Sequence, residues 1–279
     1  MSVATSSGSP WTMPPLLRAS FGLHALAAGA AVAVPDAAPW ALGSVVANHA
    51  ALTAAGLWPR SRWLGPNVTQ LPAGRAARGE IALTIDDGPD PEVTPRVLDL
   101  LDAQDVRATF FCIAERAREH AALTREIVAR GHSVQNHSLA HRHNFSLLGP
   151  RGYEAELSRA QQLLADLTGQ RPTCFRAPAG LRNPFLDPVL HRLGLHLVSW
   201  TRRGFDTRER SADRVLARLT QRLAGGDILL LHDGHAARAA SGRPVLLDVL
   251  PLLLAQARAA GLHWVTLAEA LPPRGTASA

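Results

Sequence analysis

The chain has 279 residues, 47% of them hydrophobic, which is enough to bury a sizeable core and argues against a disordered or fibrous protein. Its formal net charge of +6 is carried by arginine alone, because the sequence contains no lysine. The arginines are spread along the chain and no nucleic-acid-binding motif accompanies them, so we expect no nucleic-acid partner. Cys112 and Cys174 lie far apart within apolar runs, which favours buried free thiols over a disulfide framework.

Two long apolar stretches lie near the N-terminus, over residues 16–34 and 40–57, and each is about as long as a helix that crosses a bilayer. The sequence Pro-Asp-Ala-Ala-Pro between them is a turn signal, so we predict an apolar helical hairpin over 16–57 that inserts into a membrane. A soluble alanine-rich helical pair and a cleaved signal peptide are the alternatives. Four tryptophans near the ends of the stretches favour insertion: Trp11, Trp40, Trp58 and Trp63.

Arginines flank both outer ends of this predicted hairpin, whereas only Asp36 lies in its turn. The positive-inside rule then places the following domain on the cytoplasmic side of a bacterial-type inner membrane, although large domains can cross a membrane despite flanking charge. The predicted organisation is a flexible N-terminus over 1–15, the hairpin over 16–57, a linker over 58–78, a catalytic domain over 79–273 and a flexible tail over 274–279.

Beyond Gly79, short apolar runs rich in β-formers alternate with amphipathic helical stretches. Such alternation is typical of parallel strands and predicts an α/β fold built on a sheet or barrel. We expect strands at 81–85, 106–112, 132–135, 173–175, 195–200, 227–231 and 263–266. We expect helices at 95–104, 120–130, 153–167, 183–192, 212–224 and 245–260.

Residues able to do chemistry follow these predicted strands, at the edge where α/β barrels build their active sites. They are Asp86, Asp87, His137, Arg176, Asp206 and His232. Asp87, His137 and His141 supply one oxygen and two imidazoles, a set that suits zinc, cobalt, nickel or iron with open positions left for water and substrate. A metal held there polarises an acyl oxygen and lowers the pKa of bound water towards ~7, and Asp86 can accept the proton.

Hydrolysis of an amide also needs an acid for the leaving amine, and His232 ends a leucine-rich strand where it could reach the site. Arg176 could keep Asp86 ionised by direct pairing. Each motif has an ordinary interpretation by itself, since Asp-Asp-Gly-Pro is usually a solvated turn and histidines at i and i+4 are usually neighbours on a helix surface. Their combination indicates a metal-dependent hydrolase.

The order of these motifs resembles that of the polysaccharide deacetylases of carbohydrate esterase family four, over roughly residues 79–270. The family motif Thr-Phe-Asp-Asp-Gly-Pro corresponds to Thr84–Pro89, His-Ser/Thr-x-x-His to His137–His141, Arg-x-Pro-x-Gly to Arg176–Gly180, and a leucine-rich strand ending in histidine to Leu229–His232.

The resemblance implies a distorted (β/α)7-type barrel of parallel strands. It also implies metal-dependent hydrolysis of N-acetyl, or related small acyl, groups on amino sugars, with zinc the expected metal. The family's functional positions correspond to the base Asp86, its partner Arg176, the metal ligands Asp87, His137 and His141, the oxyanion donor Ala179 through its amide, the acid His232, and Asp206, which orients the acid.

Two departures from the family pattern affect substrate binding. An aromatic residue is usual where Ala179 stands, and the fourth motif, Asp-x-x-Asp-Trp, is reduced to Arg203-Gly204-Phe205-Asp206-Thr207. The catalytic groups are retained, so we expect an active enzyme whose acceptor differs from a long chitin-like chain. The expected partner is an N-acetylated glycan or, given the hairpin, a lipid-linked amino sugar at the bilayer. The alternative is a non-catalytic glycan-binding or membrane scaffold protein of the same fold.

Overall fold

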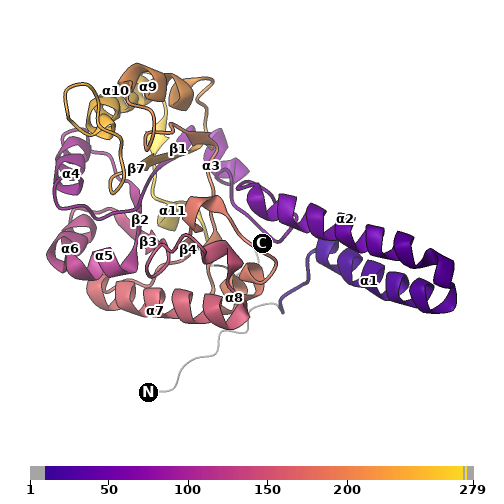
Figure 1. The fold of residues 1–279 in the computed structure, drawn as a ribbon. Helices are drawn as coiled ribbons and strands as arrows, with labels where there is room; N and C mark the ends of the chain where they lie inside the picture. Colours follow the sequence, from indigo (N-terminus) through magenta and orange to yellow (C-terminus); the bar gives the residue numbers. More distant parts are fainter. Residues whose placement is uncertain (1–9, 273, 275–279) are drawn as a thin grey trace.

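The computed structural model describes residues 10–272 and 274. The flexible ends predicted over 1–15 and 274–279 fall mostly outside these residues. The described chain forms an α/β domain from which an N-terminal helical hairpin projects (Figure 1).

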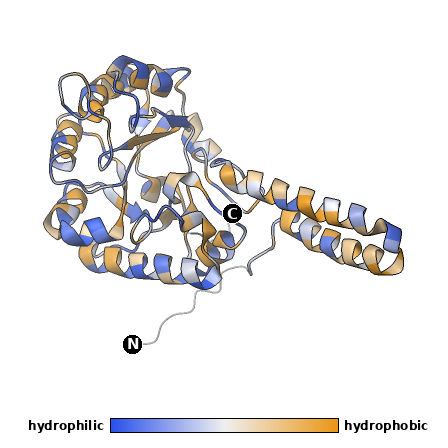
Figure 2. Ribbon diagram, viewed as in Figure 1, coloured by the Kyte–Doolittle hydropathy of each residue, from blue (hydrophilic) through white to orange (hydrophobic). Residues whose placement is uncertain are grey.

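The hairpin consists of α1 (Pro15–Ala33) and α2 (Ala38–Leu57), joined by the 3-10 turn η1 (Pro35–Ala37). Prolines within the first two positions begin each helix, where the missing N–H is not needed, and the predicted hairpin is confirmed. Hydrophobic residues run along both helices (Figure 2), and large apolar side chains are 77–85% exposed at Leu26, Val32 and Trp40.

Polar side chains connect the two helices across the hairpin. The amide of Asn48 donates to Ser20 Oγ at 2.8 Å, and the Nε2 atoms of His24 and His49 lie 3.2 Å apart. Such contacts fix the register of one helix against the other. Among the described helices, α1 alone has both the length and the apolar composition to span a bilayer, with a mean hydropathy of 1.4. Its partner α2 has the length, but polar residues such as Asn48 and His49 interrupt it.

The domain is built on an eight-stranded parallel sheet in the order β5-β4-β3-β2-β1-β7-β6, with β8 paired to the start of β1. No pairing joins the edge strands β5 and β6 within the described chain, so the barrel is open on that side, and the predicted fold class is confirmed. The strands are β1 (Glu80–Asp86), β2 (Thr109–Cys112), β3 (Ser133–Asn136), β4 (Cys174–Phe175), β5 (His196–Leu197), β6 (Arg202–Arg203), β7 (Ile228–His232) and β8 (His263–Trp264).

Every predicted strand and helix of the domain is present, with shifted ends, and further short elements were not predicted: β6, α3, α5 and α11. The helices are α3 (Ala73–Ala77), α4 (Thr94–Asp102), α5 (Ala114–Glu119), α6 (Ala121–Ala129), α7 (Pro150–Thr168), α8 (Leu186–Leu193), α9 (Ala212–Thr220), α10 (Val245–Ala259) and α11 (Leu267–Ala270), with 3-10 turns η2 (Phe145–Leu147) and η3 (Pro178–Gly180).

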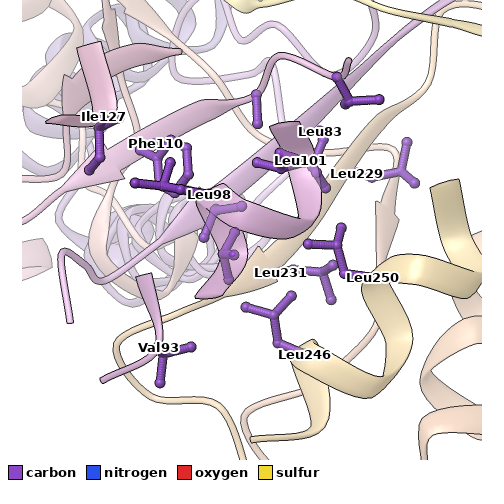
Figure 3. Close-up of a cluster of buried hydrophobic side chains, with 14 of the residues drawn as sticks. Leu83, Val93, Leu98, Leu101, Phe110, Ile127, Leu229, Leu231, Leu246 and Leu250 are labelled. Atoms are coloured by element: carbon purple, nitrogen blue, oxygen red, sulfur yellow. The ribbon is translucent and has the colours of Figure 1, made fainter. Parts of the chain in front are cut away.

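The main hydrophobic core lies between the sheet and the helices that cover it, including α4 and α10. Leu83 of β1 and Leu231 of β7 face Leu98 of α4 and Leu250 of α10 (Figure 3). Each fully buried leucine contributes about 1.5–3 kcal/mol of transfer free energy, so this core holds β1 and β7 rigidly beneath the site. Both cysteines are buried free thiols, as predicted.

The segment over 58–78, predicted to be a linker, packs closely on the domain. Val68 forms a parallel bridge with Val198 beside β5, and Leu71 N donates to Gly226 O at 2.8 Å. Leu64 is fully buried. The chain that follows the hairpin is therefore attached to the domain both beside β5 and just before β7.

Candidate metal and catalytic site

The predicted functional residues meet at the carboxyl edge of the sheet. Asp86 ends β1 and pairs in register with His232, which ends β7. His137 follows β3, and Arg176 follows β4, which β3 contacts through the pair Asn136 and Phe175. Parallel register thus brings together residues as far apart in sequence as 86 and 232.

Asp87, His137 and His141 place one ligand atom each within 4.8 Å of one another. Asp87 Oδ1 lies 3.2 Å from His137 Nε2 and 3.3 Å from His141 Nε2, yet this buried oxygen has no hydrogen-bond partner among the residues that the structure describes. The other oxygen of Asp87 is 3.0 Å from His235 Nδ1. These distances describe three donors that converge on a common point.

The hydrogen bonds of His137 determine its tautomer. Its Nδ1 lies 2.8 Å from the carbonyl oxygen of Arg176, which can only accept, so Nδ1 carries the proton and Nε2 presents a lone pair to the site. Burial disfavours a charged His137, but Asp86 and Asp87 outweigh it and raise the pKa of the imidazole. The cluster therefore favours a positive charge at this point.

The loops that carry these residues hold the backbone in unusual conformations. Asp87 (φ 76°), Ser138 (φ 69°) and His141 (φ 49°) all adopt the left-handed region without being glycine. Ser138 is held by Asn136 Oδ1, and its own hydroxyl accepts from His141 N at 2.9 Å, so the two histidines lie on a tight loop and not on a helix. Strain of this kind costs about 1–3 kcal/mol per residue and persists where the surrounding structure imposes it, commonly at functional sites.

Arg176 holds Asp86 in place. Its Nη1 donates to Asp86 Oδ1 at 2.7 Å and to Thr84 Oγ1 at 2.8 Å, and its other nitrogens donate to the carbonyls of Val198 and Ser199. The guanidinium also stacks on Phe111, with 4.2 Å to the ring centroid. Arg176 and Asp86 are 1% and 3% exposed, so this charge-assisted pair is shielded from water.

His232 is paired with Asp206 in the same buried region. Its Nδ1 lies 2.9 Å from Asp206 Oδ1, and its backbone N donates to Asp206 Oδ2 at 2.7 Å. Burial disfavours the imidazolium, but Asp206, helped by Asp86 and Asp87, outweighs it and raises the pKa of His232. Asp206 thus engages Nδ1 of His232, and the raised pKa keeps the ring protonated to higher pH.

This pairing predicts a change in pH dependence for Asp206→Asn. An acid works only while it holds its proton, so activity is lost as the pH rises through the pKa of His232. Removing the negative charge lowers that pKa, so the alkaline limb of the kcat/KM profile should move to lower pH while the acidic limb stays. An alkaline limb that does not move would exclude His232 as the titrating acid.

A cavity of about 140 Å³ connects these groups. Its walls also include Ala179 of the third motif, Arg203 and Thr207 of the fourth motif, and Trp200, which precedes the fourth motif. Ala179 is exposed and has φ 53°, so the third motif contributes a strained turn and no aromatic ring here. The cavity has room for an acyl group and part of one sugar ring, but not for a longer glycan segment.

Two residues near the site were not predicted from the sequence. His235 lies in the loop after β7, is half-exposed and contacts Asp87, as described above. Asp233 is fully buried, and burial raises its pKa to about 7, although Thr94 donates to one of its oxygens. The run His-Asp-Gly-His at 232–235 was the available signal, but the spacing alone does not show that the second histidine turns back towards Asp87.

Comparison with known proteins agrees with this geometry. The sequence profile of the polysaccharide deacetylase family matches residues 73–198, which carry β1 to β5. The peptidoglycan-N-acetylglucosamine deacetylase PgdA of Listeria monocytogenes is 31% identical over 202 residues, which are 72% of this chain and 41% of PgdA, so the chain spans less than half of that relative. The chitooligosaccharide deacetylase of Azorhizobium caulinodans is 34% identical over 170 residues, covering 58% of this chain and 79% of that protein.

A solved structure shows the same fold at a similar level of identity. The family 4 acetyl xylan esterase from Clostridium thermocellum, in complex with a cobalt ion, superposes with a TM-score of 0.61 at 28% identity, covering 68% of this chain and 89% of the esterase. The profile match, the relative covered over most of its length and the shared fold together establish that this chain belongs to the polysaccharide deacetylase family.

Proposed function

We propose that this protein hydrolyses the N-acetyl, or a related small acyl, group of amino sugars in a glycan or glycolipid. The observation that carries the proposal is the convergence of three kinds of group on one cavity: a metal-donor cluster, a buried carboxylate paired with Arg176, and a buried histidine paired with Asp206. A metal-dependent amide hydrolysis requires these groups. The activities of the relatives, on peptidoglycan and chitooligosaccharides, support the same class of substrate.

Asp87, His137 and His141 fit a divalent metal. The buried, partnerless oxygen of Asp87 faces the lone pair of His137 Nε2, an arrangement that is repulsive unless a cation or a proton lies between them. One carboxylate and two imidazoles suit zinc best, with cobalt, nickel and iron also accepted. A metal bound there supplies Lewis acidity to the acyl oxygen and to a coordinated water.

The protein's own residues would supply the remaining steps. Asp86, held in place by Arg176, accepts the proton of the attacking water. The backbone amide at Ala179 donates to the developing oxyanion, a contribution worth ~10² to 10³ in rate. His232, kept protonated by Asp206, then gives its Nε2 proton to the departing amine, so the sugar leaves with a neutral amino group.

The direct test is acetate release by the full chain in detergent, loaded with zinc or cobalt. The substrates are N-acetylglucosamine oligomers, peptidoglycan and lipid-linked N-acetyl amino sugars. Metal-dependent release from at least one of them is expected. If the chain binds both metal and glycan but releases acetate from none of these substrates, the hydrolase proposal is rejected in favour of a non-catalytic glycan-binding protein.

We further propose that the hairpin anchors residues 79–273, the catalytic unit, at a membrane. The exposed apolar surface of α1 and α2 and the span-length α1 support this anchor. Arginines lie at both outer ends, including Arg18 and Arg60, and by the positive-inside rule they favour a cytoplasmic catalytic domain.

The anchor can be tested with exposed positions on α1. The double change Phe21→Asp and Leu26→Asp adds a charge at each of two membrane-depth positions, at about 2.5–3.5 kcal/mol apiece, and should release the protein from the membrane fraction. Leu147→Asp is the matched control, since Leu147 is an exposed leucine of the catalytic domain. Carbonate extraction of expressing cells measures the effect, and release of the unaltered chain by carbonate would contradict the anchor.

A further inference from the structure

Arg203 brings a positive charge into the catalytic cavity. It lies on β6, paired in register with Leu230 of β7, two residues before His232, and both Arg203 and Leu230 line the cavity. Its neighbour Arg202 is engaged elsewhere, by Asp227 and by carbonyls at the end of α9. Because side chains alternate along a strand, one arginine joins a surface network and the other enters the site.

The guanidinium of Arg203 is held by aromatic rings and has no anionic partner in the described part of the chain. Its Cζ lies 5.2 Å from the ring centroid of Trp200 and 5.1 Å from that of Phe205. Its Nε is buried without a hydrogen-bond partner. The nearby carboxylate of Asp206 is occupied at both oxygens by His232. The cation is therefore positioned and partly desolvated, but not neutralised.

Partial burial of a cation without an anionic partner costs desolvation free energy, unless a bound anionic ligand pairs with the cation. A guanidinium offers planar, paired donors that match a phosphate or carboxylate in bidentate geometry. We infer that Arg203 binds an oxyanion carried by the amino sugar, so that the substrate class is an anionic N-acylated amino sugar. This inference rests on the proposed function and specifies its substrate.

The base of the hairpin lies beside the same cavity, and this position suggests a source for the oxyanion that Arg203 binds. The loop after Ala179 packs on the end of α2, with Arg182 N donating to Gly56 O at 3.1 Å. Ser199 Oγ donates to Pro59 O at 2.6 Å, next to the cavity residue Trp200. An inserted hairpin would thus bring the cavity near the headgroup layer, where a lipid-linked sugar carries phosphate. A sugar carboxylate is the second source of the same chemistry.

The test compares anionic with neutral substrates. The metal-loaded full chain is assayed for acetate release from N-acetylglucosamine 1-phosphate, N-acetylmuramic acid and neutral N-acetylglucosamine. For Arg203→Gln, kcat/KM for the preferred anionic substrate should fall about 10- to 100-fold, mainly through KM, and the anionic-to-neutral ratio should collapse. Arg203→Lys should be intermediate, because it retains charge without the planar fork. Arg208→Gln is the matched control, since it removes the same charge from an exposed side chain outside the cavity.

A binding measurement separates this inference from the proposed function. Calorimetry with N-acetylglucosamine 1-phosphate and N-acetylmuramic acid, on Asp86→Asn with and without Arg203→Gln, should show a Kd about 10- to 100-fold weaker in the double variant for the preferred anion. If this binding depends on Arg203 but the unaltered chain releases no acetate, the inference stands and the proposed function fails. If acetate is released and Arg203→Gln changes neither the anion preference nor the Kd, the inference is overturned. The anion bound more tightly identifies phosphate or carboxylate as the source.

Discussion

Replacing Asp86 by asparagine should lower kcat by about 10² to 10⁴ while leaving metal content unchanged. The amide keeps the size of the side chain and can still accept the hydrogen bond from Arg176, but it cannot take a proton from water. Asp86 Oδ2 lies 3.9 Å from His137 Nε2, near the metal-donor cluster and outside it. Metal analysis and steady-state kinetics on the same preparation measure both quantities.

The matched variant is His137→Ala, which removes a ligand instead of the base. It should lose stoichiometric metal together with activity, because the Nε2 lone pair of His137 is gone and only two of the three donors remain. The pair of variants distinguishes binding from chemistry. Wild-type turnover in Asp86→Asn would reject Asp86 as the base, and full metal occupancy in His137→Ala would reject the donor assignment.

Replacing Arg176 by methionine should reduce the free energy of unfolding by about 3–5 kcal/mol. The change leaves Asp86 as a buried charge without its partner and leaves the carbonyls of Val198 and Ser199 without donors. Denaturant unfolding in the presence of a chelator is the appropriate measurement, because bound metal would stabilise the folded state by mass action.

Two further variants make this stability result specific. Arg192→Met removes an exposed arginine that pairs with Glu154 and should cost less than about 1 kcal/mol. Combining Arg176→Met with Asp86→Asn should recover part of the loss, because the buried charge disappears with its partner. A loss for Arg176→Met as small as that for Arg192→Met would show that the buried pair contributes little to stability.

The secondary structure was largely predictable because its signals are local. The long apolar stretches and the proline-rich turn between them predict the hairpin, and the alternation of apolar runs with amphipathic stretches predicts the parallel sheet. The missed elements are short and lack such a signal. Strand β6 consists of Arg202 and Arg203, which no propensity favours as a buried strand, and it forms because β7 offers an edge to pair with.

Some features of the candidate site were likewise predictable from the sequence and others were not. The motifs carry their residue types and spacing in the sequence, so candidates for the metal donors, the base and the acid could be proposed from the sequence alone. The sequence could not show that Asp87 Oδ1 is buried without a partner, or that His235 turns back to contact it. Those facts depend on loop conformations imposed by packing, as the left-handed backbone of Asp87 and His141 illustrates.

The sequence by itself therefore determined the family resemblance, the α/β fold class and the candidate residues of the site, because these follow from local pattern and motif order. Tertiary structure decided which groups are desolvated, which charges are paired and what surrounds the cavity. Arg203 shows the difference. In the sequence it replaces the first aspartate of the family's fourth motif. In the fold it is a cation with no anionic partner among the described residues, and it packs on Trp200 and Phe205 in the cavity that His232 also lines. Burial and pairing depend on contacts between distant segments, and no local pattern encodes them.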